Sequence, residues 1–123
     1  MKYLAISLGG ILGANARYLM TGWAAEKFGT AFPHGTFIIN ISGALVLGFF
    51  MAFVQDRAFV HANYRLFFAT GFCGAYTTFS TFTYETLRLF QDGSVLLGFT
   101  NILTSLLAGM LGVFLGFMIG RMI

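Results

Sequence analysis

The sequence predicts an all-α integral membrane protein with four transmembrane helices. The chain of 123 residues is 58% hydrophobic and only 9% charged, whereas a soluble domain has about 25% charged residues. Four apolar stretches follow one another, at about 3–25, 35–54, 64–90 and 94–120. Each reaches the roughly 20 residues that cross a bilayer. Because they fill the chain, we expect residues 1–123 to form a single transmembrane domain.

The first stretch has a second interpretation, since Met1 and Lys2 precede an apolar run that ends near Ala14-Asn15-Ala16. This pattern is typical of a cleavable signal peptide. The apolar character resumes at residues 18–20 and continues to residue 25, which favours a retained helix. Arg17 lies within that helix, where a long side chain can reach toward headgroups or a carboxylate.

The second and fourth stretches carry isolated polar residues at membrane depth. Asn40 lies in the second, while Asn101, Thr104 and Ser105 share one face of the fourth. A lone hydroxyl often bonds back to its own helix, but an asparagine needs partners on another helix or in water. Small residues spaced by four predict close helix packing. They are Gly9 and Gly13, then Ala44 and Gly48, then Ala108, Gly112, Gly116 and Gly120.

Between Gly71 and Phe82, the third stretch contains two glycines, five hydroxyl residues and a pair of phenylalanines three apart, Phe79 and Phe82. Irregular backbone at this depth is tolerated only where it is buried in protein or lines a cavity. We therefore expect a broken third helix, interrupted over residues 71–77 and resumed from residue 78. Freed carbonyls at such a break can coordinate a small cation. Phe79 and Phe82 share a face, which indicates either core packing or ring edges turned to an anion.

The charges, the single cysteine and the lack of catalytic motifs exclude several classes of function. The net charge of +3 comes from scattered side chains, and no basic cluster indicates nucleic acid. The single cysteine, Cys73, excludes an internal disulfide, and no catalytic motif is present, so we expect no enzyme. Glu85 and Arg88, three residues apart, could form an interfacial ion pair or a pore mouth.

The loops show a weak charge bias. The end with both termini and the second loop holds four basic residues, Lys2, Arg57, Arg65 and Arg121, and the other end holds Lys27 and Arg88. This bias allows either termini in the cytoplasm or insertion in both orientations.

The string Thr77-Thr78-Phe79-Ser80-Thr81-Phe82, followed by Glu85-Thr86, resembles a signature of the Fluc (CrcB) family of fluoride channels. Residues 71–74 (GFCG), Gly35-Thr36 and Asn40 add to the resemblance, which extends over the whole chain. It implies an antiparallel, dual-topology homodimer in the bacterial inner membrane, crossing it several times. It also implies two pores, each lined by both subunits, and passive export that lowers cytoplasmic fluoride.

The resemblance further implies the residues of the site. Those matched to fluoride contacts are Asn40, Phe79, Phe82 and Ser105. Backbone carbonyls of Gly74 and Thr77 match those that hold a structural, non-transported Na⁺ on the dimer axis. Family members can carry a further hydroxyl where this chain has Gly109, a place that Thr104 or Asn101 could fill. Glu85 and Arg17 are candidate vestibule residues.

Two other functions fit a small four-helix membrane protein. A small multidrug-type, proton-coupled exporter uses a glutamate within its first helix, but this chain has no carboxylate there before Glu26. A non-transporting assembly subunit would need only the small-residue faces. That alternative leaves Asn40 and the polar face of the fourth helix without a purpose.

Overall fold

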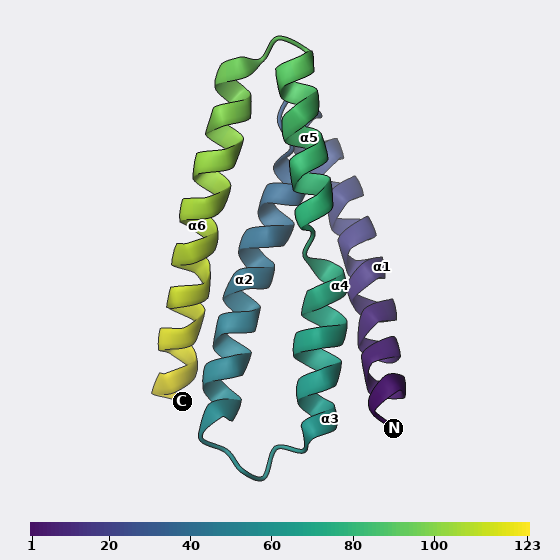
Figure 1. Cartoon of the computed structure of the whole chain (residues 1–123), viewed down its shortest axis with the longest axis vertical. Helices are drawn as coiled ribbons and strands as arrows, with labels where there is room; N and C mark the ends of the chain where they lie inside the picture. The colour runs from purple at the N-terminus through teal and green to yellow at the C-terminus, as the bar shows by residue number, and fades with distance from the viewer.

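The chain folds into four antiparallel helical rods, and a computed structural model describes all 123 residues (Figure 1). The first, second and fourth rods are α1 (Lys2–Phe28), α2 (His34–Gln55) and α6 (Val95–Met122). The third rod consists of α3 (Ala62–Arg65), the π-helical segment η1 (Leu66–Cys73), α4 (Gly74–Tyr76) and α5 (Phe79–Gln91). The predicted all-α fold of four helices is confirmed, with ends that differ from the expected ones by no more than a turn.

Two of the four rods, α2 and α6, are long and apolar enough to cross a membrane. Helix α1 is equally long but carries Asn15 and Arg17 in its middle, and the third rod is divided into shorter pieces. Only 22 of 123 residues are buried, so most large apolar side chains face outward. Such a surface suits lipid or a partner rather than water. That all four rods cross the bilayer stays a prediction.

Helices α2 and α6 lie side by side because glycines let their backbones approach. A Cβ atom added to Gly112 or Gly116 would meet the carbonyl of Ile41 or Leu45 on α2. In the opposite direction, a Cβ on Gly48 would meet the carbonyl of Val113 on α6. The small-residue face predicted for the fourth helix is therefore used within the chain, against α2.

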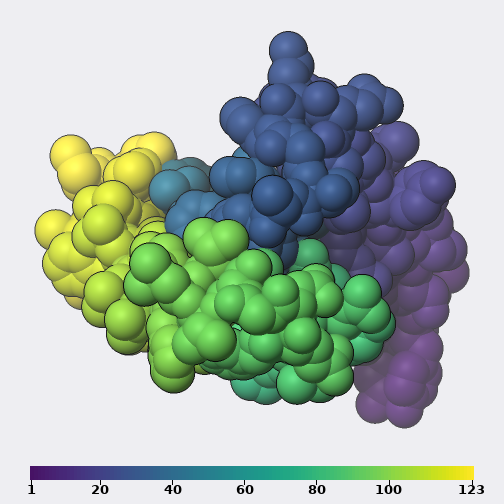
Figure 2. All heavy atoms as spheres, turned by 90° about the horizontal axis from the view of Figure 1, so that it is seen from above, coloured from purple at the N-terminus to yellow at the C-terminus, as the bar shows by residue number.

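Helix α1 packs in the same way against η1. Gly9 and Gly13 lie against the backbone of Phe67 and Phe72, and Gly71 lies against that of Ile6. Gly71 thus serves close packing within a segment that stays helical. Seen from the end with the α5–α6 loop, α1 and the C-terminal part of α6 lie on opposite flanks (Figure 2). The two glycine-packed pairs, α1 with η1 and α2 with α6, form the two sides of the molecule.

The interruption of the third rod is shorter and later than expected. The helix continues through Tyr76, and only Thr77 and Thr78 leave helical geometry, with ψ of 156° and 117°. The expected break over residues 71–77 is therefore wrong, and the helix resumes at Phe79 rather than Thr78. No glycine is needed, because both threonines adopt ordinary extended backbone. Thr78 then starts α5 by accepting a hydrogen bond from the Thr81 amide at 3.2 Å.

Replacing Gly116 with alanine should destabilise the fold, because the new Cβ would overlap the Leu45 carbonyl. Overpacking of this kind costs roughly 1–3 kcal/mol. The matched control is Gly10→Ala, also within a helix, where a Cβ would meet nothing within 4 Å. Thermal unfolding in detergent should show a lower midpoint for Gly116→Ala and an unchanged or higher one for Gly10→Ala. Equal unfolding midpoints for the two variants would contradict close backbone packing between α2 and α6.

Candidate functional site

Asn40 on α2 binds both backbone groups that the break exposes at Thr78. Its Nδ2 donates to the Thr78 carbonyl at 3.1 Å, and its Oδ1 accepts from the Thr78 amide at 2.8 Å. Thr78 is only 7% exposed. Buried backbone groups need partners, particularly in a bilayer. Asn40 therefore makes an extended residue tolerable here, and one of its two amide N–H groups stays free of this pairing.

The break leaves two carbonyls without their usual helical donors. In a continuous α-helix, the Thr78 amide would bond to the Gly74 carbonyl, and the Thr81 amide to the Thr77 carbonyl. Here the Thr78 amide binds Asn40, and the Thr81 amide binds the Thr78 hydroxyl. The carbonyls of Gly74 and Thr77 are thereby available to another group. Carbonyl oxygens suit a hard cation.

The segment before the break is held by the same turn of α2. The Tyr76 hydroxyl lies 2.9 Å from the Ser42 hydroxyl, and the Tyr76 ring stacks on Phe72 with centroids 5.7 Å apart. A Cβ on Gly43 would meet the Thr77 side chain and the Tyr76 ring. One turn of α2, residues 40–43, thus contacts the chain on both sides of the break.

Phe79 and Phe82 lie together just after the break. Their ring centroids are 6.0 Å apart, with an angle of 48° between the planes. Phe82 is buried, whereas Phe79 is 74% exposed, so its ring has no cover within one chain. Both rings line an apolar groove between α5 and α6 of about 530 Å³. The other lining residues are Thr83, Thr86, Leu87, Phe90, Ile102 and Leu106.

A buried polar network joins α5 to α6 beside this groove. Asn101, 1% exposed, donates to the Thr86 hydroxyl at 2.9 Å and accepts from Ser105 at 3.3 Å. The Thr86 hydroxyl in turn donates to the Phe82 carbonyl at 2.7 Å. Thr104 is not part of this network, because it is exposed and its hydroxyl donates to the Thr100 carbonyl of its own helix. Gly109 has open space, with only Ile41 near an added Cβ.

Glu85 lies at the end of the molecule that carries the α1–α2 and α5–α6 loops. Its carboxylate accepts a hydrogen bond from the Thr36 hydroxyl of α2. It lines two adjoining cavities of about 440 and 100 Å³, which also share Thr30 and Pro33. Arg88 lines the larger cavity, but Arg17 lines neither. The structure therefore brings Glu85 to an open recess and leaves Arg17 apart from it.

Three polar partners were not predicted as site residues. Thr36, Thr86 and Tyr76 each bond a residue on a neighbouring helix, namely Glu85, Asn101 and Ser42. The sequence signal was present, since each is a hydroxyl in an apolar stretch. A hydroxyl alone, however, does not reveal which helix it contacts.

The chain matches one family model over residues 4–117, described as CrcB-like protein, Camphor Resistance (CrcB). Several curated relatives carry the name fluoride-specific ion channel FluC. That of Clostridium perfringens (strain ATCC 13124) is 46% identical over 120 residues, which is 98% of this chain and 94% of the relative. That of Koribacter versatilis is 49% identical over 85% of this chain and 82% of its own length. The protein of Acidobacterium capsulatum is 46% identical over 100% of this chain and 98% of the relative.

Replacing Asn40 with leucine should loosen the break, because the Thr78 amide and carbonyl would lose their partners. Leaving such groups buried and unpaired costs roughly 1–3 kcal/mol. Hydrogen exchange should become faster at residues 78–82, and the unfolding midpoint should fall. Asn15→Leu is the control, since Asn15 is exposed and bonds only the Ile11 carbonyl of its own helix. Unchanged exchange in Asn40→Leu would show that the amide does not hold the break.

Proposed function

The chain belongs to the CrcB family, and we propose that it is a fluoride-selective channel through which fluoride leaves the cytoplasm passively. The resemblance carried by residues 77–82 is confirmed by the family model and by relatives that match nearly the whole chain. Those relatives are named as ion channels, a function that needs no catalytic residues. This agrees with a sequence that contains no catalytic motif.

One observation carries the proposal: the pair Phe79 and Phe82 beside the Asn40–Thr78 contact. The rim of a phenyl ring is weakly positive, and an amide N–H donates to anions. The rings follow Thr78 directly along the chain, and Asn40 is bound to Thr78. These groups offset part of the hydration of fluoride without a full positive charge, so the ion can leave as well as enter.

We assign the remaining polar residues supporting roles along the same ion pathway. Ser105 extends the path along α6, where its hydroxyl already belongs to the network with Asn101. Glu85 belongs to the vestibule, because it lines the open recess near the loops. Thr104 is exposed and bonds only its own helix, and Arg17 lines neither recess, so we expect any role of these two residues to depend on a second subunit.

We also propose a structural Na⁺ held by the carbonyls of Gly74 and Thr77. Both carbonyls have lost their helical donors, which fits the oxygen ligands that Na⁺ takes at half-helix ends. Two carbonyls are too few to replace a hydration shell, so a second subunit must add its own. When bound, the ion would supply positive potential near the centre of the pathway.

The proposed assembly is an antiparallel, dual-topology homodimer that spans the bacterial inner membrane several times. Phe79 is exposed, and the groove beside it is open, so one chain does not enclose a pathway. The weak bias of basic residues between the two ends permits both orientations.

A cysteine placed at Asp56, which is exposed in the α2–α3 loop, should then be labelled from both sides of the membrane.

Purified protein in liposomes should release trapped fluoride rapidly, as measured with a fluoride electrode, while chloride stays trapped. No proton gradient should be needed, because a channel moves ions down their own gradient. Equal movement of both anions would rule out selectivity. A requirement for a proton gradient would instead favour the coupled exporter considered from the sequence.

Phe79→Ile and Phe82→Ile should each slow this fluoride release at least tenfold, which corresponds to about 1.4 kcal/mol in barrier height. The reason is that an aliphatic side chain lacks the positive ring edge. Phe114→Ile is the control, since Phe114 is 59% exposed on α6 and does not line the groove. If both α5 variants retained wild-type release and assembly, the two rings would be ordinary packing residues.

Exchanging Na⁺ for the bulky cation N-methyl-D-glucamine should lower the melting temperature and slow fluoride release. Both changes follow if Na⁺ links carbonyls of two subunits at the break. K⁺ should substitute poorly, because it is larger. Identical melting and release in all three cations would contradict a structural Na⁺ but would leave the channel proposal standing.

A further inference from the structure

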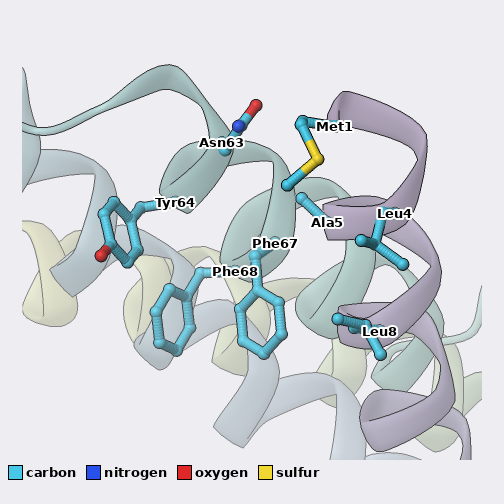
Figure 3. A pocket seen from close by; sticks show the side chains of 8 residues that line it. All are labelled: Met1, Leu4, Ala5, Leu8, Asn63, Tyr64, Phe67 and Phe68. Carbon is cyan, nitrogen blue, oxygen red and sulfur yellow. The ribbon is translucent and has the colours of Figure 1, made fainter.

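Three polar side chains from two helices form a continuous chain of hydrogen bonds: Thr86 of α5, and Asn101 and Ser105 of α6. The helix contact near the N-terminus is different, since seven of the eight residues that line the groove between α1 and the start of the third rod are hydrophobic (Figure 3). Asn101 is the middle member of the polar chain and is 1% exposed. Its side-chain amide has donors on one atom and an acceptor on the other, so its orientation sets the direction of the whole chain.

In the structure this direction engages the hydroxyl proton of Ser105. Nδ2 of Asn101 donates to the Thr86 hydroxyl at 2.9 Å, and that hydroxyl donates to the Phe82 carbonyl at 2.7 Å. The Ser105 hydroxyl donates to Oδ1 of Asn101 at 3.3 Å. A hydroxyl has a single proton and two lone pairs. In this direction Ser105 therefore offers only lone pairs to a further group, and lone pairs repel an anion.

The same three side chains can also bond in the reverse direction. A half turn of the Asn101 amide exchanges its nitrogen and oxygen, which have nearly the same size. Nδ2 would then donate to the Ser105 oxygen, and the Thr86 hydroxyl would donate to Oδ1. The Phe82 carbonyl would lose the Thr86 hydroxyl but keep the amide donor of its own helix. Both directions join the three side chains by two hydrogen bonds, but only the reverse direction leaves the Ser105 proton free.

From these hydrogen bonds we propose that Asn101 is a positioning residue of the ion pathway: reversal of its amide frees the Ser105 hydroxyl to donate to an anion. This inference rests on the proposed function, in which Ser105 is a fluoride contact. Ser105 is half-buried, so its hydroxyl can reach a passing ion, whereas Asn101 is enclosed and acts through Ser105. An anion accepts a hydrogen bond from Ser105 only in the reverse direction. Since a ligand shifts an equilibrium toward the state that it binds better, fluoride favours the reversed amide.

The direct test follows the Asn101 side-chain amide by NMR of the purified full chain, with its signals identified by their loss in Asn101→Leu. Replacing chloride with fluoride should shift these signals, because the amide changes its hydrogen-bond partners. The amide of Asn15, which bonds only the Ile11 carbonyl, is the internal control and should not shift. Ser105→Ala should abolish the response of Asn101. An unmoved Asn101 amide in a wild-type protein that releases fluoride from liposomes would overturn this inference and leave the channel proposal standing.

A second test measures fluoride release by single and double variants. In Asn101→Leu no amide turns the Ser105 hydroxyl outward, so this hydroxyl should bond back to its own helix, as that of Thr104 does. Release should fall several-fold, and Asn15→Leu is the matched control that should keep the wild-type rate.

The double variant Asn101→Leu with Ser105→Ala should release fluoride no more slowly than Ser105→Ala alone, because Asn101 acts through that serine. A merely structural role of Asn101 would instead multiply the two losses, and this result would overturn the inference. Release at the wild-type rate by Asn101→Leu would overturn it as well.

Discussion

The structure depends on the pair of hydrogen bonds between Asn40 and Thr78. In a bilayer no water is at hand to satisfy an exposed amide and carbonyl, so a two-residue interruption needs a side chain that offers both a donor and an acceptor. An asparagine side chain does so within one group. Because the Thr78 amide binds Asn40, the Gly74 carbonyl loses its helical donor. Because the Thr81 amide binds the Thr78 hydroxyl, the Thr77 carbonyl also loses its helical donor. The polar character of the break thus follows from Asn40 on α2 together with the hydroxyl of Thr78.

The glycine seams explain why that residue is in place. Because they have no Cβ atom, Gly112 and Gly116 let α6 contact the backbone of α2. Gly9, Gly13 and Gly71 allow the same contact between α1 and η1. Between the two pairs, Gly43 lets α2 approach the Thr77 side chain and the Tyr76 ring, close to where Asn40 binds Thr78. The side chains these seams leave uncovered include Phe79, which lies where a second subunit could contribute. The same helix packing that closes the contacts within the chain therefore leaves the Phe79 ring exposed to a second subunit.

The sequence predicts the four helices well because long apolar stretches and charged loops decide them. It also predicts a break, and Asn40 does bind the break while Phe79 and Phe82 lie just after it. Their roles as fluoride contacts stay predictions. It misplaces the break, because glycine is read as a sign of loose backbone, whereas Gly71 is there for contact with α1. It groups Thr104 with Asn101 and Ser105 by helical spacing, although Thr104 bonds to its own helix. Pairings such as Thr36 with Glu85 depend on how helices are rotated, which spacing along one helix does not fix.

The contact between α2 and the break also bears on how the recognisable motif could be transplanted. Residues 77–82 carry the family's signature, yet the turn of α2 from Asn40 to Gly43 holds the chain on both sides of the interruption. In a foreign four-helix scaffold, the string alone would be free to close into a regular helix, since its threonines can bond back to their own carbonyls. A design that is meant to reproduce the break therefore has to include both segments, residues 77–82 and the α2 turn from Asn40 to Gly43. Residues 77–82 alone would carry the sequence of the motif without its extended backbone.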